Sequence, residues 1–193
     1  MQVRTRMASW ENTCWKDINV DQMDMETKKF CLDLRAMDKD LRSWDVYSGL
    51  DSTLRNYVTS LRSVGELQNT AIRERHWQEL MHTTGVQFSM SESTTLFDLL
   101  SLHLHKFEED VRGIVDKAVK ELTMEKVLKE LDATWSTMVF EHEPHGRTGT
   151  PLLKVDDELV EILEDNQVKF LTVMKYFVKI FLVLVTESVA HFR

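Results

Sequence analysis

The sequence predicts a mainly α-helical protein, an elongated multi-helix bundle or rod with one β-hairpin near residues 137–155. The 193 residues include only 6 Gly and 2 Pro, so few positions favour tight turns and long helices are expected. Apolar residues recur every three or four positions over most of the chain, which is the period of one helical face. An apolar fraction of 42% and a charged fraction of 29% are typical of a chain that folds around a buried core.

Three amphipathic helices are predicted before residue 85. Between residues 23 and 44 the apolar positions share one helical face, and they are Met23, Phe30, Leu34, Met37, Leu41 and Trp44. Gly49 is expected to end this helix, because glycine commonly follows a helix C-terminus. The second helix has the stripe Leu50, Leu54, Tyr57, Leu61 and Val64. A short third helix at residues 72–81 has the anchors Trp77, Leu80 and Met81.

The longest helical pattern follows a loop at residues 85–93. Thr95 and Asp98 have the spacing of a capping box, with Asp in place of the usual Glu, so a helix is expected to begin there. One apolar stripe then comprises Leu96, Leu99, Leu100, His103, Phe107, Val111, Ile114, Ala118 and Leu122. The same pattern continues through Met124, Val127, Leu128, Leu131 and Trp135.

The period of the sequence changes after residue 136. Residues 137–143 alternate loosely and are rich in strand formers, residues 145–150 are turn-like, and residues 151–155 are expected to return as a second strand. These three segments together predict the β-hairpin. Asp156 is placed to cap a final helix. The apolar side of that helix comprises Leu159, Ile162, Leu163, Phe170 and Val173.

Composition argues against several classes of partner and compartment. The formal net charge of -8 disfavours nucleic-acid binding, which needs clustered Lys and Arg, and it disfavours direct contact with acidic polymers such as the microtubule lattice. The only cysteines, Cys14 and Cys31, form no CxxC and no disulfide framework, so a reducing, cytosolic compartment is expected. The N-terminus lacks the apolar core of a secretory signal.

The most apolar run of the chain lies at residues 177–185. A bilayer span needs about 20 consecutive apolar residues, and Lys175 and Lys179 interrupt the approach to this run. We therefore expect a buried helix end and no membrane partner. If exposed, a run so rich in β-branched residues would be prone to aggregation.

No catalytic, cofactor-binding or metal-binding residue is predicted, and no cofactor is expected. The chain has no GxxxxGK[ST] phosphate loop, so nucleotide hydrolysis is not expected of it. The cluster His142-Glu-Pro-His145 contains a proline that forbids the helical i, i+4 pair of many zinc sites, and a polar hairpin is favoured over a metal site. His103 is expected on the apolar stripe and His105 away from it, neither with a catalytic partner.

Trp77 has two interpretations. A Trp flanked by Arg75 and His76 on a short helix has the residue types of an interaction hot spot. It is equally the kind of side chain that packs between two helices in a core, and for a single Trp the buried position is favoured.

A series of ordered motifs resembles the linker region of dynein heavy chains, most closely those of the axonemal type. Arg73-Glu-Arg-His-Trp77, followed by Leu80-Met81 and Gly85-Val86, is similar to the "RERHW…LM…GV" of that family. The resemblance continues through residues 96–104, 114–122, 125–131 and Trp135. It ends with Glu143-Pro-His-Gly-Arg-Thr-Gly-Thr-Pro-Leu-Leu153 and Leu163-Glu-Asp-Asn-Gln167, and upstream it includes Trp44-Asp-Val-Tyr-Ser-Gly-Leu50. It covers about residues 10–168 and is closest to outer-arm chains of the beta type.

The resemblance implies a mechanical role without catalysis. In that family this region begins the linker, a rod that crosses the AAA+ motor ring and changes shape as ATP is hydrolysed elsewhere in the heavy chain. The implied partners are the AAA+ ring and the intermediate and light chains of the parent complex, and the implied location is the cytoskeleton of the ciliary axoneme. The family's ATP sites and microtubule-binding tip have no counterpart in these residues.

Three regions are expected from the extent of the resemblance. Residues 1–22 form an N-terminal extension, residues 23–168 the N-terminal part of the linker, and residues 169–193 a divergent apolar C-terminal helix. Two other functions remain open. One is a free-standing helical adaptor or scaffold that binds partner helices through Met-rich and Trp-rich faces. The other, least favoured, is a hydrolase or metalloprotein built on residues 142–145.

Overall fold

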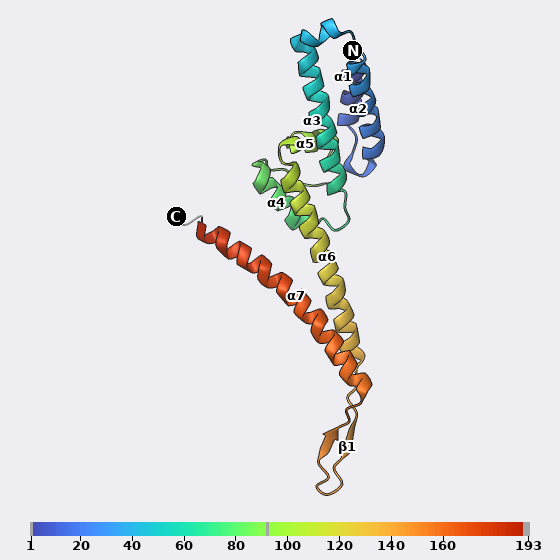
Figure 1. The fold of residues 1–193 in the computed structure, drawn as a ribbon, viewed down its shortest axis with the longest axis vertical. Coiled ribbons are helices and arrows are strands. Elements are labelled where there is room, and N and C mark those ends of the chain that lie inside the picture. Colours follow the sequence, from blue (N-terminus) through green and yellow to red (C-terminus); the bar gives the residue numbers. More distant parts are fainter. Residues whose placement is uncertain (1, 92, 191–193) are drawn as a thin grey trace. The chain divides into compact units, whose positions relative to one another are not determined.

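The computed structural model describes residues 2–91 and 93–190 and divides the chain into two compact units, Met1–Lys120 and Glu121–Arg193. Unit 1 contains the α-helices α1 (Gln2–Glu11), α2 (Val20–Arg35), α3 (Asp45–Leu67), α4 (Glu74–Thr84) and α5 (Leu96–Leu100), and the start of α6 (Glu108–Thr137). Three 3₁₀ turns lie between them, η1 (Trp15–Asp17), η2 (Lys39–Ser43) and η3 (Leu104–Lys106). Unit 2 contains the rest of α6, strands β1 (His142–Pro144) and β2 (Pro151–Leu153), and α7 (Asp157–Ala190). The mainly α class and the single hairpin are thereby confirmed (Figure 1).

The core of unit 1 is centred on α3. Its buried apolar residues are Leu54, Tyr57, Leu61, Val64 and Leu67, at the spacing of one helical face, so the predicted stripe is confirmed from Leu54 onward. Helix α2 lies antiparallel beside α3 (Figure 1). The two helices approach closely at Gly65, where an added Cβ would lie 3.2 Å from Cγ1 of Val20. Any larger residue at position 65 would therefore push against α2.

The helix predicted over residues 23–44 is shorter than expected. Helix α2 ends at Arg35, directly after the buried Leu34, and residues 39–43 form a 3₁₀ turn. Met37 and Trp44 are exposed, so beyond Leu34 the helix would gain nothing from packing. The prediction that Gly49 ends a helix is wrong, since it lies inside α3 with open space beside it and causes no break.

The helix predicted to run from Thr95 through residue 122 is interrupted. The capping box is confirmed, because the Thr95 backbone N–H donates to Oδ2 of Asp98 at 2.8 Å, but α5 is only five residues long. His103 adopts φ +53, the left-handed region, and turns the chain before α6 begins. Leu102 and Leu104 are both buried, which one continuous helix would not allow because it places them about 200° apart.

The predicted burial of the two histidines is therefore reversed. His103 is exposed and His105 is half-buried, with ring centroids 5.9 Å apart. Partial burial lowers the pKa of His105, and the neighbouring His103 adds to this. The helical pattern did not predict the turn at residue 103, and this turn exposes His103 and partly buries His105.

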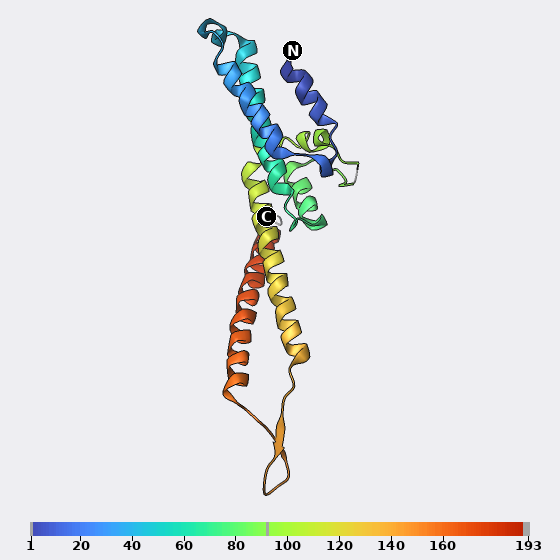
Figure 2. The ribbon, with the colours of Figure 1, turned by 90° about the vertical axis from the view of Figure 1, so that its right-hand side faces the viewer.

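Unit 2 contains the hairpin and the final helix. The strands pair His142 with Leu153 and Pro144 with Pro151, and they are shorter than the predicted 137–155 because Thr137 still belongs to α6. Figures 1 and 2 show the hairpin beyond the point where α6 ends and α7 begins. The Leu159 backbone N–H donates to Oδ1 of Asp156 at 2.8 Å, which confirms the predicted cap of α7.

The apolar run at residues 177–185 lies within α7, but side chains after residue 178 fall outside the described ones. No helix among the described residues is both long and apolar enough to cross a bilayer.

Candidate functional site: a charged concavity and the anchor of α6

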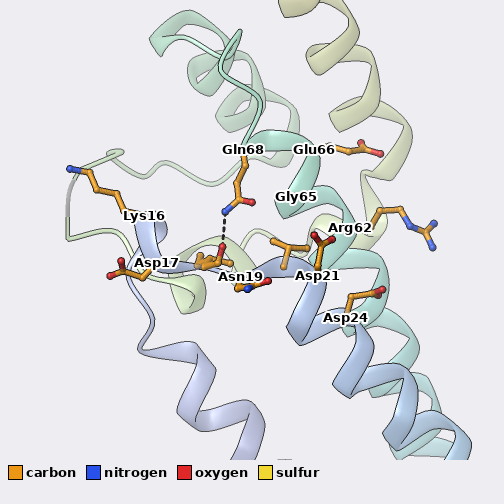
Figure 3. Close-up of a pocket in the computed structure, with 11 residues that line it drawn as sticks. Lys16, Asp17, Asn19, Asp21, Asp24, Arg62, Gly65, Glu66 and Gln68 are labelled. Atoms are coloured by element: carbon orange, nitrogen blue, oxygen red, sulfur yellow. Dashed lines mark hydrogen bonds between the residues drawn. The ribbon is translucent and has the colours of Figure 1, made fainter.

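An open concavity of about 740 Å³ lies where the chain enters α2 beside the end of α3 (Figure 3). The Gln68 side chain donates to the Ile18 carbonyl at 3.1 Å, and Asn19 accepts the Gln22 backbone N–H at 3.1 Å. These two bonds fix the entry of the chain into α2 and so give the concavity its shape. The charged residues that line it are Lys16, Asp17, Asp21, Asp24, Arg62 and Glu66.

The concavity has the composition of a polar surface. Its two cationic and four acidic side chains give it a net negative charge, and no Ser, Thr or Cys is among its lining residues. In the part of the chain that the structure describes, no group of three or more His, Cys, Asp or Glu side chains is placed to hold a metal ion. The arrangement offers hydrogen-bond donors and acceptors of both charges on an open surface.

Two residues that line this concavity, Arg62 and Glu66, also form ion pairs with the first turns of α6. Nη1 of Arg62 lies 3.1 Å from Oε1 of Glu108, and Nη2 of Arg112 lies 3.4 Å from the same oxygen. Nε of Arg112 lies 3.9 Å from Oε1 of Glu66. We call this network, together with the Lys117–Glu79 pair at 2.8 Å, the α6 anchor.

The α6 anchor supplements apolar packing. Val111, Ile114 and Ala118 are buried at helical spacing on the inner side of α6. The ion pairs around them are partly exposed, so each contributes at most about 1 kcal/mol and is weakened by salt. Together the two layers attach the N-terminal part of α6 to α3 and α4.

The second buried feature of unit 1 surrounds the Arg73-Glu-Arg-His-Trp77 motif. Trp77 is 8% exposed and makes edge-to-face contacts with Trp15 and Phe88, at centroid distances of 5.7 and 5.9 Å. This confirms the core position for Trp77. The hot-spot interpretation requires an exposed ring, so it does not apply to this residue.

His76 has a role that the sequence analysis missed. Its Nδ1 accepts the Arg73 backbone N–H at 3.0 Å, and its side chain is buried. Because Nδ1 accepts this bond, it holds no proton, and the imidazole takes the place of the Glu in a capping box at the start of α4. The N-cap to N3 spacing was visible in the sequence, but histidine is not the usual residue at that position.

The histidines of the hairpin do not join a site among the described residues. His142 and His145 are both exposed on the hairpin, and Nδ1 of His145 lies 2.9 Å from Oγ1 of Thr148. That contact stays within the turn, where Gly149 has φ +67. Both cysteines are free thiols.

The fold and this site define a class of protein, a helical module with a braced long helix and an open, acidic concavity. The model of the family "Dynein heavy chain, N-terminal region 2" matches residues 1–188. The chain belongs to the dynein heavy-chain family and corresponds to that N-terminal region.

Individual relatives agree with the family. The chain is 57% identical over 192 residues to the ciliary dynein beta chain of Tripneustes gratilla. The matched segment covers 100% of this chain and 4% of that relative. It is 61% identical over 172 residues to dynein axonemal heavy chain 17 of Homo sapiens, covering 89% of this chain and 4% of that one. The flagellar outer-arm alpha chain of Chlamydomonas reinhardtii is 39% identical over 165 residues, covering 85% and 4%. The chain thus spans about 4% of the length of these relatives.

Proposed function

We propose that this chain is the beginning of the linker of an axonemal dynein heavy chain and relays ATP-driven conformational change without a catalytic site of its own. On this proposal it acts in microtubule-based movement in the ciliary axoneme, the setting that the names of its relatives indicate. Its immediate partner would be the AAA+ ring of the motor, with intermediate and light chains in the parent complex. No nucleic acid, membrane or direct microtubule contact is proposed.

The observation that supports the relay is the α6 anchor. A mechanical element must transmit displacement instead of absorbing it, which requires a stiff body held firmly at its base. Helix α6 is 30 residues long, and its first three turns are held by buried apolar residues and by ion pairs to two other helices. The division into residues 1–22, 23–168 and 169–193 remains part of the proposal.

The relay is tested by loosening the anchor in a full-length axonemal heavy chain. Arg112→Glu would place a fourth carboxylate among Glu66, Glu108 and Glu109, all of which now lie within 4 Å of the guanidinium. We expect slower microtubule gliding with basal ATPase activity unchanged. Arg147→Glu, an identical charge reversal on the exposed hairpin loop, is the matched control. Equal gliding velocities for the two variants would contradict the relay.

Binding to the ring is tested separately. The 193-residue chain should associate with a purified AAA+ ring that lacks its own linker. No association above that of a scrambled-sequence control would count against the proposed partner, whatever the gliding assay gives.

One observation favours the adaptor as a second candidate. Trp44 is 61% exposed and Val46 is 77% exposed at the start of α3, so both side chains are available to a partner. On this alternative, Trp44→Ala should weaken saturable binding to a non-motor partner helix. Unchanged affinity would remove the adaptor role for this surface.

A further inference from the structure

Helix α7 has a broad apolar face, and nothing in the described part of unit 2 covers most of it. Its inner face includes the buried Asn166 and Val173. Phe170 and Phe177 flank Val173 on this face, three residues before it and four residues after it. From there the face widens around the helix, and seven of its apolar side chains are 38–54% exposed along five turns. We call this set the open stripe: Val160, Leu163, Phe170, Leu171, Met174, Phe177 and Val178.

The spacing of the open stripe is that of a coiled-coil seam. Positions 160, 163, 167, 170, 174 and 177 alternate steps of three and four residues, and only Gln167 among them is polar. A seam of this kind fits a second helix with the same spacing and fits flat surfaces poorly, because its side chains interdigitate as knobs into holes. The geometry therefore calls for another helix as the occupant.

The charges beside the open stripe indicate which helix. The first turns of α7 expose Glu158, Glu161, Glu164 and Asp165, whereas the following turns expose Lys169 and Lys175. Glu164 follows Val160 by four residues and Lys175 follows Leu171 by four, so both lie along the same edge of the stripe. This edge is acidic first and basic later along α7, so it is complementary to a neighbouring helix that places basic residues beside Glu164 and acidic residues beside Lys175.

A second copy of α7 laid antiparallel has that reversed charge. Glu164 and Lys175 lie six residues before and five residues after Phe170, so a two-fold axis near Phe170 brings Glu164 of each copy opposite Lys175 of the other. A parallel pair would instead set carboxylate against carboxylate and ammonium against ammonium, which is repulsive. We propose that the open stripe is a self-association surface, through which two copies of this chain pair by antiparallel α7 helices.

The test is sedimentation equilibrium of the whole 193-residue chain over a micromolar concentration series. A reversible dimer of twice the 22.7 kDa chain mass is expected. Phe170→Glu places a charge in the centre of the seam in both copies and should weaken the dimer about a hundredfold or more. Thr172→Glu, at an exposed position on the same helix and nearly half a turn from the seam positions 170 and 174, should leave the dissociation constant within about twofold. Circular dichroism of each variant checks that α7 remains helical.

Charge exchange tests the orientation of the helices. Glu164→Lys alone and Lys175→Glu alone should each weaken the dimer about tenfold, because each creates two like-charged pairs. The double variant should restore the original affinity, since it recreates both opposite-charge pairs with their signs exchanged. A monomer throughout the series would overturn the proposal. A dissociation constant unchanged by Phe170→Glu would overturn it as well. So would a double variant whose dimer dissociates as readily as those of the single variants.

Discussion

Trp77→Ala provides a direct test of the proposed core, because the chain contains its own control. The indole of Trp77 is 8% exposed and touches the rings of Trp15 and Phe88, whereas Trp44 is 61% exposed. Truncating a buried Trp costs about 3–5 kcal/mol, and each aromatic pair adds roughly 0.5–1.5 kcal/mol beyond buried area. Allowing for overlap between these two effects, we expect Trp77→Ala to lower the free energy of unfolding of unit 1 by about 4 kcal/mol.

Urea denaturation followed by far-UV circular dichroism measures this loss. With a denaturant slope of about 2 kcal/mol per molar urea, the midpoint for unit 1 should fall by about 2 M. Trp44→Ala should change the free energy of unfolding by no more than about 0.5 kcal/mol, as expected for an exposed side chain. Near-UV circular dichroism should lose the aromatic signal of the cluster only in the Trp77 variant. Equal, small shifts for both variants would refute the assignment of Trp77 to the core.

Three further perturbations address the cap, the anchor and a buried hydroxyl. His76→Phe leaves the Arg73 backbone N–H without its acceptor and should cost about 1–2 kcal/mol in thermal unfolding, with His76→Gln recovering part of the loss. Arg112→Glu should destabilise unit 1 by about 1–2 kcal/mol at low salt and by less in concentrated salt, unlike Arg147→Glu; an unfolding midpoint insensitive to salt would contradict the anchor. The Tyr57 hydroxyl is buried and has no hydrogen-bond partner among the described residues, and burial raises the pKa of Tyr57. Because the phenol ionises less readily in the folded state, its ionisation does not affect the free energy of unfolding below the unfolded pKa of about 10 and lowers it as the pH rises above that value. Tyr57→Phe removes the unpaired hydroxyl, so it should be neutral or stabilising near pH 7. It should also reduce the loss of stability in alkali.

Much of the local structure could be predicted because it depends on residues close together in the sequence. The Thr95–Asp98 box and the Asp156 cap each join groups three residues apart, so spacing alone identifies them. The stripe on α3 and the hairpin likewise follow from periods of 3.6 and 2. The ordered motifs of residues 10–168 were enough to indicate the dynein heavy-chain family.

Helix ends and exposure could not be predicted in this way. Met37 continues the apolar spacing of α2, yet the helix stops at Arg35 because no partner covers the next turn. His103 fits the stripe of a long helix, yet the chain turns there so that Leu102 and Leu104 are both buried. Ion pairs such as Arg62–Glu108 join residues 46 positions apart, and no local pattern indicates them.

The sequence by itself determined the helical class, the caps at Thr95 and Asp156 and the hairpin, since each follows from hydrogen bonding and periodicity over a few neighbouring residues. The order of its motifs indicated the family. The tertiary structure alone decided that Trp77 is buried and Trp44 exposed, where α2 and α5 end, and that α6 is anchored at its base. These outcomes depend on which distant residues come into contact, because a side chain is stabilised by burial only when another element is there to cover it.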